Sequence, residues 1–141
     1  MLYTVDLTIP ANTPKSSWVC KDITVKEGVL NHVSVLIPAG HHALAHLVIL
    51  DGQTQIIPHN PGSSIHGDNE VVTFRTHIPI PEPERKLTIC GWNEDTDYDH
   101  TFYVRLNILP PLVANPSELI YKLLHVIFKR MRLLPRGWRS P

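Results

Sequence analysis

The stretch HALAHLVILDGQTQIIP, residues 42–58, decides the fold class of this chain. Residues 44–50 are apolar on both faces apart from His46, which is typical of a strand in the interior of a sheet. The dipeptide Asp51-Gly52 follows, and an Asp-Gly pair between two strand-like runs predicts a tight turn into an antiparallel strand. The stretch therefore predicts a β-hairpin whose first strand is buried.

Alternating apolar and polar side chains predict further strands on both sides of this hairpin. The alternating segments are LYTVDLTI (2–9), VVTFRTHIPI (71–80) and TFYVRLNIL (101–109), and apolar runs of strand length occur at 29–38 and 86–92. PHNPGSSIHGDNE (58–70) reads as a long loop. PIPEPER (79–85) reads as a stiff, proline-rich connection, because proline lacks the N–H that a strand ladder uses. The pattern predicts roughly seven or eight short strands, whose order cannot be derived from it.

The segment NPSELIYKLLHVIFKRMRLLPRGWRSP, residues 115–141, predicts a helix. Asn115 is a good N-cap, and Pro116 suits the first helical position. Pro135 ends the apolar run, so the helix is expected over 116–134.

These elements predict a mainly β protein. We expect an antiparallel β-sandwich of jelly-roll or immunoglobulin-like type over residues 1–110, with a C-terminal amphipathic α-helix. A linker at 111–115 is expected to join the sandwich to a basic helix and tail over 116–141.

The predicted helix is apolar over an unusually wide arc. On a helical wheel the apolar residues cover about 220°, roughly twice what one contact surface needs. Leaving half of about ten such side chains in water would forgo roughly 7–15 kcal/mol, at ~1.5–3 kcal/mol each. We therefore expect the helix to contact a second molecule besides its own sandwich. The expected partner-binding residues are Leu119, Ile120, Leu123, Leu124, Ile127, Phe128, Met131, Leu134, Trp138, Arg130, Arg132, Arg136 and Arg139.

Charge is divided unevenly along a chain whose net charge is zero. Residues 1–116 hold seven Lys or Arg against twelve Asp or Glu, whereas residues 117–141 hold six against one. A basic tail on an acidic body favours an acidic partner, most simply another copy of the same body. An anionic membrane surface and nucleic acid are weaker alternatives: the apolar arc is wide for a helix that lies on a membrane, and Trp138 is the one aromatic residue near the basic cluster that could stack on bases.

A β-sandwich followed by a C-terminal helix resembles, in overall plan, the small virion proteins that decorate or stabilise the capsids of tailed viruses. The resemblance implies a structural or assembly protein that oligomerises, or docks on another structural protein, through its helix. The sequence has no glycine-rich phosphate loop, no nucleophile elbow and no paired catalytic carboxylates, so we expect that the protein is not an enzyme and needs no cofactor. The N-terminus, MLYTVDLTIPANTP, lacks the basic and long apolar regions of a secretory signal, so the expected location is the virion or the cytoplasm.

A carbohydrate- or calcium-binding module is the alternative function. Asp95, Asp97 and Asp99 in NEDTDYDH (93–100) have the opening spacing of a calcium loop, although the glycine and glutamate of an EF-hand are missing. Trp18, Trp92 and Tyr98 are candidates for a sugar-binding platform.

A jelly-roll metalloenzyme is the third and weakest alternative. PGSSIHGDN (61–69) resembles the second metal motif of cupins, but the preceding His-x-His element is missing. His42 and His46 would lie about 13 Å apart on a strand, too far for one ion, so no metal site is predicted.

Cys20 and Cys90 fit no metal spacing and lie in strand-like segments. Two buried thiols are favoured over a disulfide, because no feature of the sequence indicates an oxidising compartment. No apolar run approaches the ~18–20 residues that cross a bilayer, so no membrane span is expected.

Overall fold

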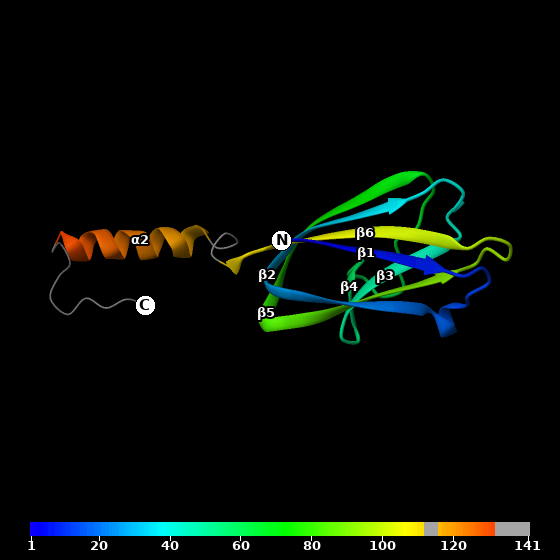
Figure 1. Ribbon diagram of the computed structural model, residues 1–141, viewed down its shortest axis with the longest axis horizontal. Coiled ribbons are helices and arrows are strands. Elements are labelled where there is room, and N and C mark those ends of the chain that lie inside the picture. Colours follow the sequence, from blue (N-terminus) through cyan, green and yellow to red (C-terminus); the bar gives the residue numbers. More distant parts are fainter. Residues whose placement is uncertain (112–115, 132–141) are drawn as a thin grey trace.

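The computed structural model describes residues 1–111 and 116–131, which form a mainly antiparallel β structure followed by a helix (Figure 1). The strands are β1 (Leu2–Ile9), β2 (Val19–Ile37), β3 (Ala45–Asp51), β4 (Thr54–Ile57), β5 (Glu70–Asn93) and β6 (His100–Leu109); the 3-10 helix η1 spans Lys15–Ser17, and the helix α2 spans Pro116–Arg130. The predicted fold class is confirmed. The expected helix end at residue 134 lies outside the described residues.

The six strands form one sheet in the order β1-β6-β2-β5-β3-β4, and this sheet folds over into two layers. The strands β2 and β5 are long enough to belong to both layers. The first layer contains β1, β6, the second half of β2 and the first half of β5; the second layer contains the other halves with β3 and β4. The register of β2 shifts between Lys26 and Gly28, where the strand passes from one layer to the other.

Glycine is required at this passage. Gly28 has φ +148°, and a Cβ atom there would collide with the carbonyl oxygen of Leu109 on β6.

The space between the layers is filled by the apolar residues that alternation predicted. On β1, Val5, Leu7 and Ile9 are buried while the residues between them are exposed. On β6 the buried set is Phe102, Val104, Leu106 and Ile108. The predicted hairpin is also confirmed, since β3 and β4 pair around Gly52, whose φ of +63° suits a tight turn.

The prediction that residues 79–85 form a connection between strands is wrong. These residues lie within β5, where Pro79 pairs with Val29 and Arg85 pairs with Val25. In the described structure, β3 pairs with β5 only from Leu87 onward, so the earlier half of β5 is an edge. Proline is tolerated on an edge, because its missing N–H would otherwise face solvent. As a result, two long strands replace several of the short ones expected.

The expectation of two buried thiols is also wrong, because Cys20 and Cys90 form a disulfide. They are directly opposite each other on β2 and β5, with Cα atoms 4.1 Å apart. Cys20 is exposed and Cys90 is buried, on the outer face of the second layer. Strand register, which the sequence does not reveal, brings the two sulfur atoms together.

Candidate functional site

The helix α2 extends away from the end of the sandwich where β6 stops (Figure 1). The large apolar side chains that the sequence assigned to partner binding are all solvent-accessible where the structure describes them. Their exposed fractions are 39% for Leu119, 56% for Ile120, 55% for Leu123, 45% for Leu124, 48% for Ile127, 41% for Phe128 and 60% for Met131. Leu134, Trp138, Arg132, Arg136 and Arg139 lie outside the described residues. In the described chain, α2 therefore presents an apolar surface to solvent.

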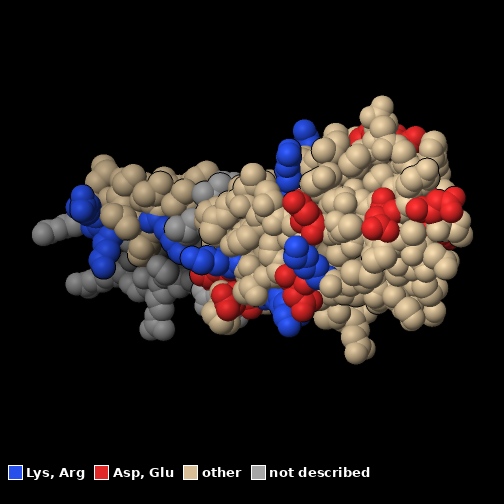
Figure 2. Space-filling model, turned by 45° about the vertical axis from the view of Figure 1, so that its right-hand side comes forward, with Lys and Arg blue, Asp and Glu red and all other residues tan. Residues whose placement is uncertain are grey.

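Basic side chains accompany this apolar surface, and acidic ones gather elsewhere. Lys129 and Arg130 lie in the last turn of α2. Figure 2 shows the Lys and Arg side chains along the helix and acidic side chains over the sandwich, including its far end. That far end carries the turn 93–100, because β6 begins there at His100 and runs toward α2. The molecule thus has a basic, apolar end and an acidic end.

The acidic end also carries exposed apolar side chains. Tyr103, Leu36 and Val71 are directly opposite one another on β6, β2 and β5, and they are 38%, 38% and 55% exposed. Asp6 of β1 continues this row on the outer face of the first layer. The exposed Tyr98 belongs to the neighbouring turn. Three strands at about 4.8 Å spacing make a strip roughly 10 Å wide, which matches the diameter of one helix.

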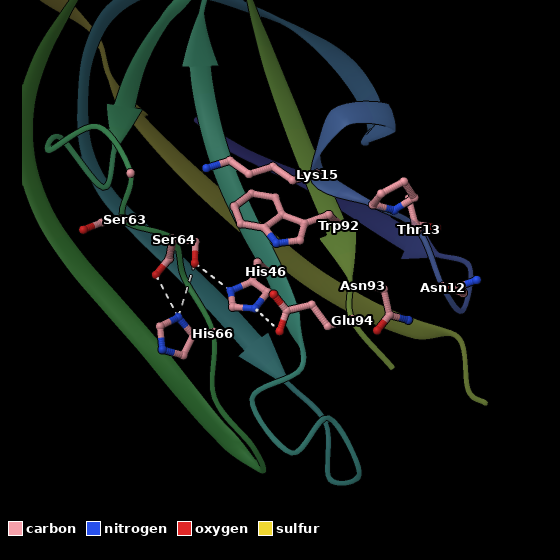
Figure 3. Close-up of a pocket in the computed structure, with 12 residues that line it drawn as sticks. Asn12, Thr13, Lys15, His46, Ser63, Ser64, His66, Trp92, Asn93 and Glu94 are labelled. Atoms are coloured by element: carbon pink, nitrogen blue, oxygen red, sulfur yellow. Dashed lines mark hydrogen bonds and ion pairs between the residues drawn. The ribbon is translucent and has the colours of Figure 1, made fainter. Parts of the chain in front are cut away.

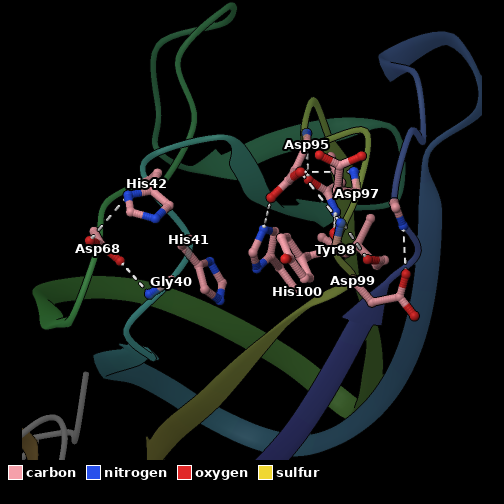
Figure 4. Close-up of polar contacts among 12 residues, drawn as sticks. Gly40, His41, His42, Asp68, Asp95, Asp97, Tyr98, Asp99 and His100 are labelled. Carbon is pink, nitrogen blue, oxygen red and sulfur yellow. Dashed lines mark hydrogen bonds and ion pairs between the residues drawn. The ribbon is translucent and has the colours of Figure 1, made fainter.

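The three aspartates proposed as weak calcium ligands do not converge on one point (Figure 4). Asp95 accepts hydrogen bonds from the backbone N–H of Asp97 (2.9 Å) and from His100 Nε2 (2.8 Å), while Asp99 accepts the N–H of Ala11 (2.7 Å). The pKa of Asp95 is lowered, first by the Asp97 N–H and then by His100. The carboxylates of Asp95 and Asp99 therefore stabilise the turn, and no group of metal ligands occurs among the described residues.

The expectation that His42 and His46 lie on one strand is wrong, because β3 begins at Ala45 and His42 precedes it in a turn, with φ +48°. His42 is largely exposed, 3.9 Å from Asp68, whereas His46 faces a cavity on the second layer. His41 is 2% exposed, donates from Nε2 to the carbonyl of Thr101 (3.1 Å), and has a pKa lowered mainly by burial.

Of the three aromatic residues suggested for a sugar-binding platform, Trp92 is buried, whereas Trp18 and Tyr98 are exposed. Trp92 is only 7% exposed; the ring of His46 stacks on it at 4.9 Å, and the ammonium of Lys15 lies 4.9 Å from its centre. Trp18 packs against Trp92 with ring centres 6.3 Å apart, and Tyr98 lies in the turn between β5 and β6. Trp92 is therefore covered by its neighbours.

Sequence reasoning missed a cavity of about 710 Å³ on the outer face of the second layer (Figure 3). His46 lies in its wall, between Ser64 and Glu94. The Nδ1 atom of His46 is 2.8 Å from Ser64 Oγ, and its Nε2 atom is 3.5 Å from Glu94 Oε2. His66 Nδ1 is a further neighbour of the hydroxyl, at 3.3 Å. No local motif marks this group, because its members come from β3, from the loop before β5 and from the residue after β5.

None of the known protein families matches this sequence, and no curated protein matches it. Among solved structures, the chain is similar to the crystal structure of FlhE, with a TM-score of 0.38 and 10% identity over 77% of this chain and 96% of that chain. A likeness at this level carries no argument about function. No helix in the described residues is long and apolar enough to cross a membrane.

Proposed function

We propose that this protein is a structural protein that assembles with copies of itself through α2. The observation that carries the proposal is the row of apolar side chains on α2, each 39% exposed or more in the single chain. Isolated helices of this length are marginal in water, so burial against a partner would stabilise the helix as well as the contact.

The acidic end of a second copy is the partner surface we favour. It offers the strip of Tyr103, Leu36 and Val71 to the apolar face of α2, and the acidic turn 93–100 to its basic face. A hollow of about 530 Å³ at this end is lined by Asp95, Tyr98, Asp99 and His100, among others. Opposite charge at the two ends favours a head-to-tail contact and opposes contact between like ends.

More specifically, we propose that the assembled protein is a component of a virion shell. The disulfide supports it in one respect, because disulfides persist in oxidising surroundings such as the exterior of a released particle. For the same reason, we favour a location outside the reducing cytoplasm over the cytoplasmic alternative. We rank the carbohydrate and calcium alternatives lower, because the ring of Trp92 is covered by His46 and the carboxylates of Asp95 and Asp99 accept backbone N–H groups.

Light scattering after size exclusion, on the full chain across a concentration series, tests the assembly. Leu123 and Ile127 are one turn apart and 55% and 48% exposed. Replacing both with alanine removes about half of ~1.5–3 kcal/mol at each position, so the dissociation constant should rise about tenfold to a hundredfold. Leu2→Ala is the matched control, because Leu2 is equally apolar and 65% exposed but lies on the sandwich.

Charge reversal identifies the receiving surface. Asp97→Lys at the acidic end should weaken association, and Lys129→Glu on α2 should restore it in the double variant if the two ends meet. A full-length protein that remains monomeric at about 100 μM would overturn the assembly proposal. If neither charge variant changes the dissociation constant, the protein still assembles, but the acidic end is not the partner surface.

A further inference from the structure

We propose that Ser64 is a nucleophile for acyl transfer, with His46 as its general base and Glu94 as the residue that positions His46. The distances that carry this inference are 2.8 Å from Ser64 Oγ to His46 Nδ1 and 3.5 Å from His46 Nε2 to Glu94 Oε2 (Figure 3). A serine hydroxyl beside a histidine that is oriented by a carboxylate defines an activated nucleophile by geometry, whatever the order of the residues in the chain. The inference does not depend on the assembly proposal, since no residue of α2 lines the cavity.

The carboxylate of Glu94 bears on which tautomer of His46 is present, and only one tautomer can accept the proton of Ser64. Nε2 of His46 lies 3.5 Å from Glu94 without a hydrogen bond, and because a carboxylate is an acceptor, its closer approach would favour the tautomer of His46 with the proton on Nε2. The unprotonated Nδ1 then accepts the hydrogen bond from the Ser64 hydroxyl. Burial lowers the pKa of His46, and Glu94 partly offsets this effect, so the neutral ring that can accept a proton is favoured.

Backbone hydrogen bonds hold the three side chains in place. Leu47 and Ile65, each next to a member of the group, exchange two bonds of 2.9 and 2.8 Å. The N–H of Glu94 donates to the carbonyl of Leu44 at 2.9 Å. The ring of His46 is fixed by stacking on Trp92 at an interplanar angle of 10°. Such support keeps reacting groups in a productive arrangement before a substrate arrives.

The substrate class we assign is carboxylic esters. Ser64 Oγ would attack the carbonyl carbon while its proton moves to His46 Nδ1, and the bond to the alcohol oxygen would break as that oxygen takes the proton from His46. Water then attacks the acyl–serine with His46 again as base, which releases the carboxylic acid and restores the hydroxyl. Lys15 lines the same cavity and is the cation that would stabilise the negative charge developing on the carbonyl oxygen.

Covalent labelling of the full chain tests the nucleophile directly. Incubation with diisopropyl fluorophosphate should add one diisopropylphosphoryl group, which peptide mass spectrometry should locate on Ser64. A p-nitrophenyl acetate assay should show a burst of about one equivalent of p-nitrophenol. Ser64→Ala should abolish both signals. Ser63→Ala is the matched control, because Ser63 lines the same cavity but its hydroxyl bonds to Asn60, and it should retain both signals.

A second variant tests the proposal by a gain of reactivity, which a misfolded protein would not show. Ser64→Cys should react with iodoacetamide faster than a free thiol at the same pH, provided that His46 activates the atom at this position. An unlabelled wild-type Ser64 after prolonged exposure to millimolar reagent would overturn the inference. Equal ester hydrolysis by wild type and a folded Ser64→Ala protein would overturn it as well.

The role of Glu94 needs a readout that a merely structural contact would not change. The labelling rate of the wild type should stay constant as the pH is lowered to the ordinary range of histidine titration. At still lower pH the rate should fall, because His46 becomes protonated. Glu94→Gln should slow labelling by at least about tenfold, because the favoured tautomer is lost. It should also move the midpoint of the pH profile to lower pH, since the carboxylate raises the pKa of His46. An unchanged midpoint would remove Glu94 from the proposed site.

Discussion

The disulfide between Cys20 and Cys90 should supply a large share of the stability of the sandwich. It joins the edge segment of β2 to β5 and closes a loop with a sequence separation of 70 residues. In the chain-entropy model, a loop of this length restricts the unfolded chain by about 4.4 kcal/mol. Since a typical domain is stable by only ~5–15 kcal/mol, reduction should remove a substantial fraction of the total.

Urea unfolding with and without dithiothreitol measures this effect on the same polypeptide. With a slope of ~1–3 kcal/mol per molar urea, a loss of about 4.4 kcal/mol lowers the unfolding midpoint by roughly 1.5–4 M. Cys20→Ala should behave like the reduced wild type, because the Cys20 side chain is exposed and its removal opens no cavity. Dithiothreitol should have no effect on that variant.

A small effect would refute the reasoning. A reduced protein within about 1 kcal/mol of the oxidised one would mean that the unfolded chain is already compact enough for the cross-link to restrict little. A Cys20→Ala variant much less stable than the reduced wild type would show that packing by the sulfur atoms, and not chain restriction, is responsible.

The remaining predictions concern single residues of the sandwich. Gly28→Ala should destabilise by at least about 1–3 kcal/mol in urea titrations, because its methyl group would meet the carbonyl of Leu109 and its φ of +148° disfavours any side chain. Asn93→Ala should cost about 3 kcal/mol by the same measurement, since this buried amide donates to two backbone carbonyls and accepts one N–H. Stability should fall as pH drops below about 6.5, because burial lowers the pKa of His41 and the unfolded chain takes up its proton first; thermal melts of His41→Phe should show a weaker dependence over that range.

The sequence was sufficient where a feature depends on one segment. The alternation in residues 2–9 and 101–109 predicts which side chains enter the core, because the period of a strand is set by the backbone alone. The Asp51-Gly52 turn and the start of α2 are local signals of the same kind. The exposed apolar face of α2 also follows from its own residues, together with the small size of the sandwich.

Features that depend on the register between strands could not be predicted from the sequence. The three prolines in residues 79–85 indicate a break in the chain, and they are accommodated only because β5 has a free edge there. The pairing of Cys20 with Cys90 requires β2 to align with β5 residue for residue. The contact of Ser64 with His46 requires the bridge between Leu47 and Ile65, which joins the loop before β5 directly to β3, although β4 separates them in the sequence. In each case the feature depends on residues that are close in space but far apart in the sequence.

The position of α2 decides what kind of assembly the proposed contact would form. Two helices meeting side by side in parallel would bring their basic last turns together, which costs energy at the contact. Binding of α2 to the acidic end of the next copy avoids this repulsion, and the two contacting surfaces are then different parts of the chain. Such a contact leaves a free helix at one end and a free acidic surface at the other, so growth continues until a ring closes or the filament is capped. The average mass in light scattering should therefore keep rising with concentration or stop at a closed ring, and a plateau at an isologous dimer would favour helix-to-helix pairing instead.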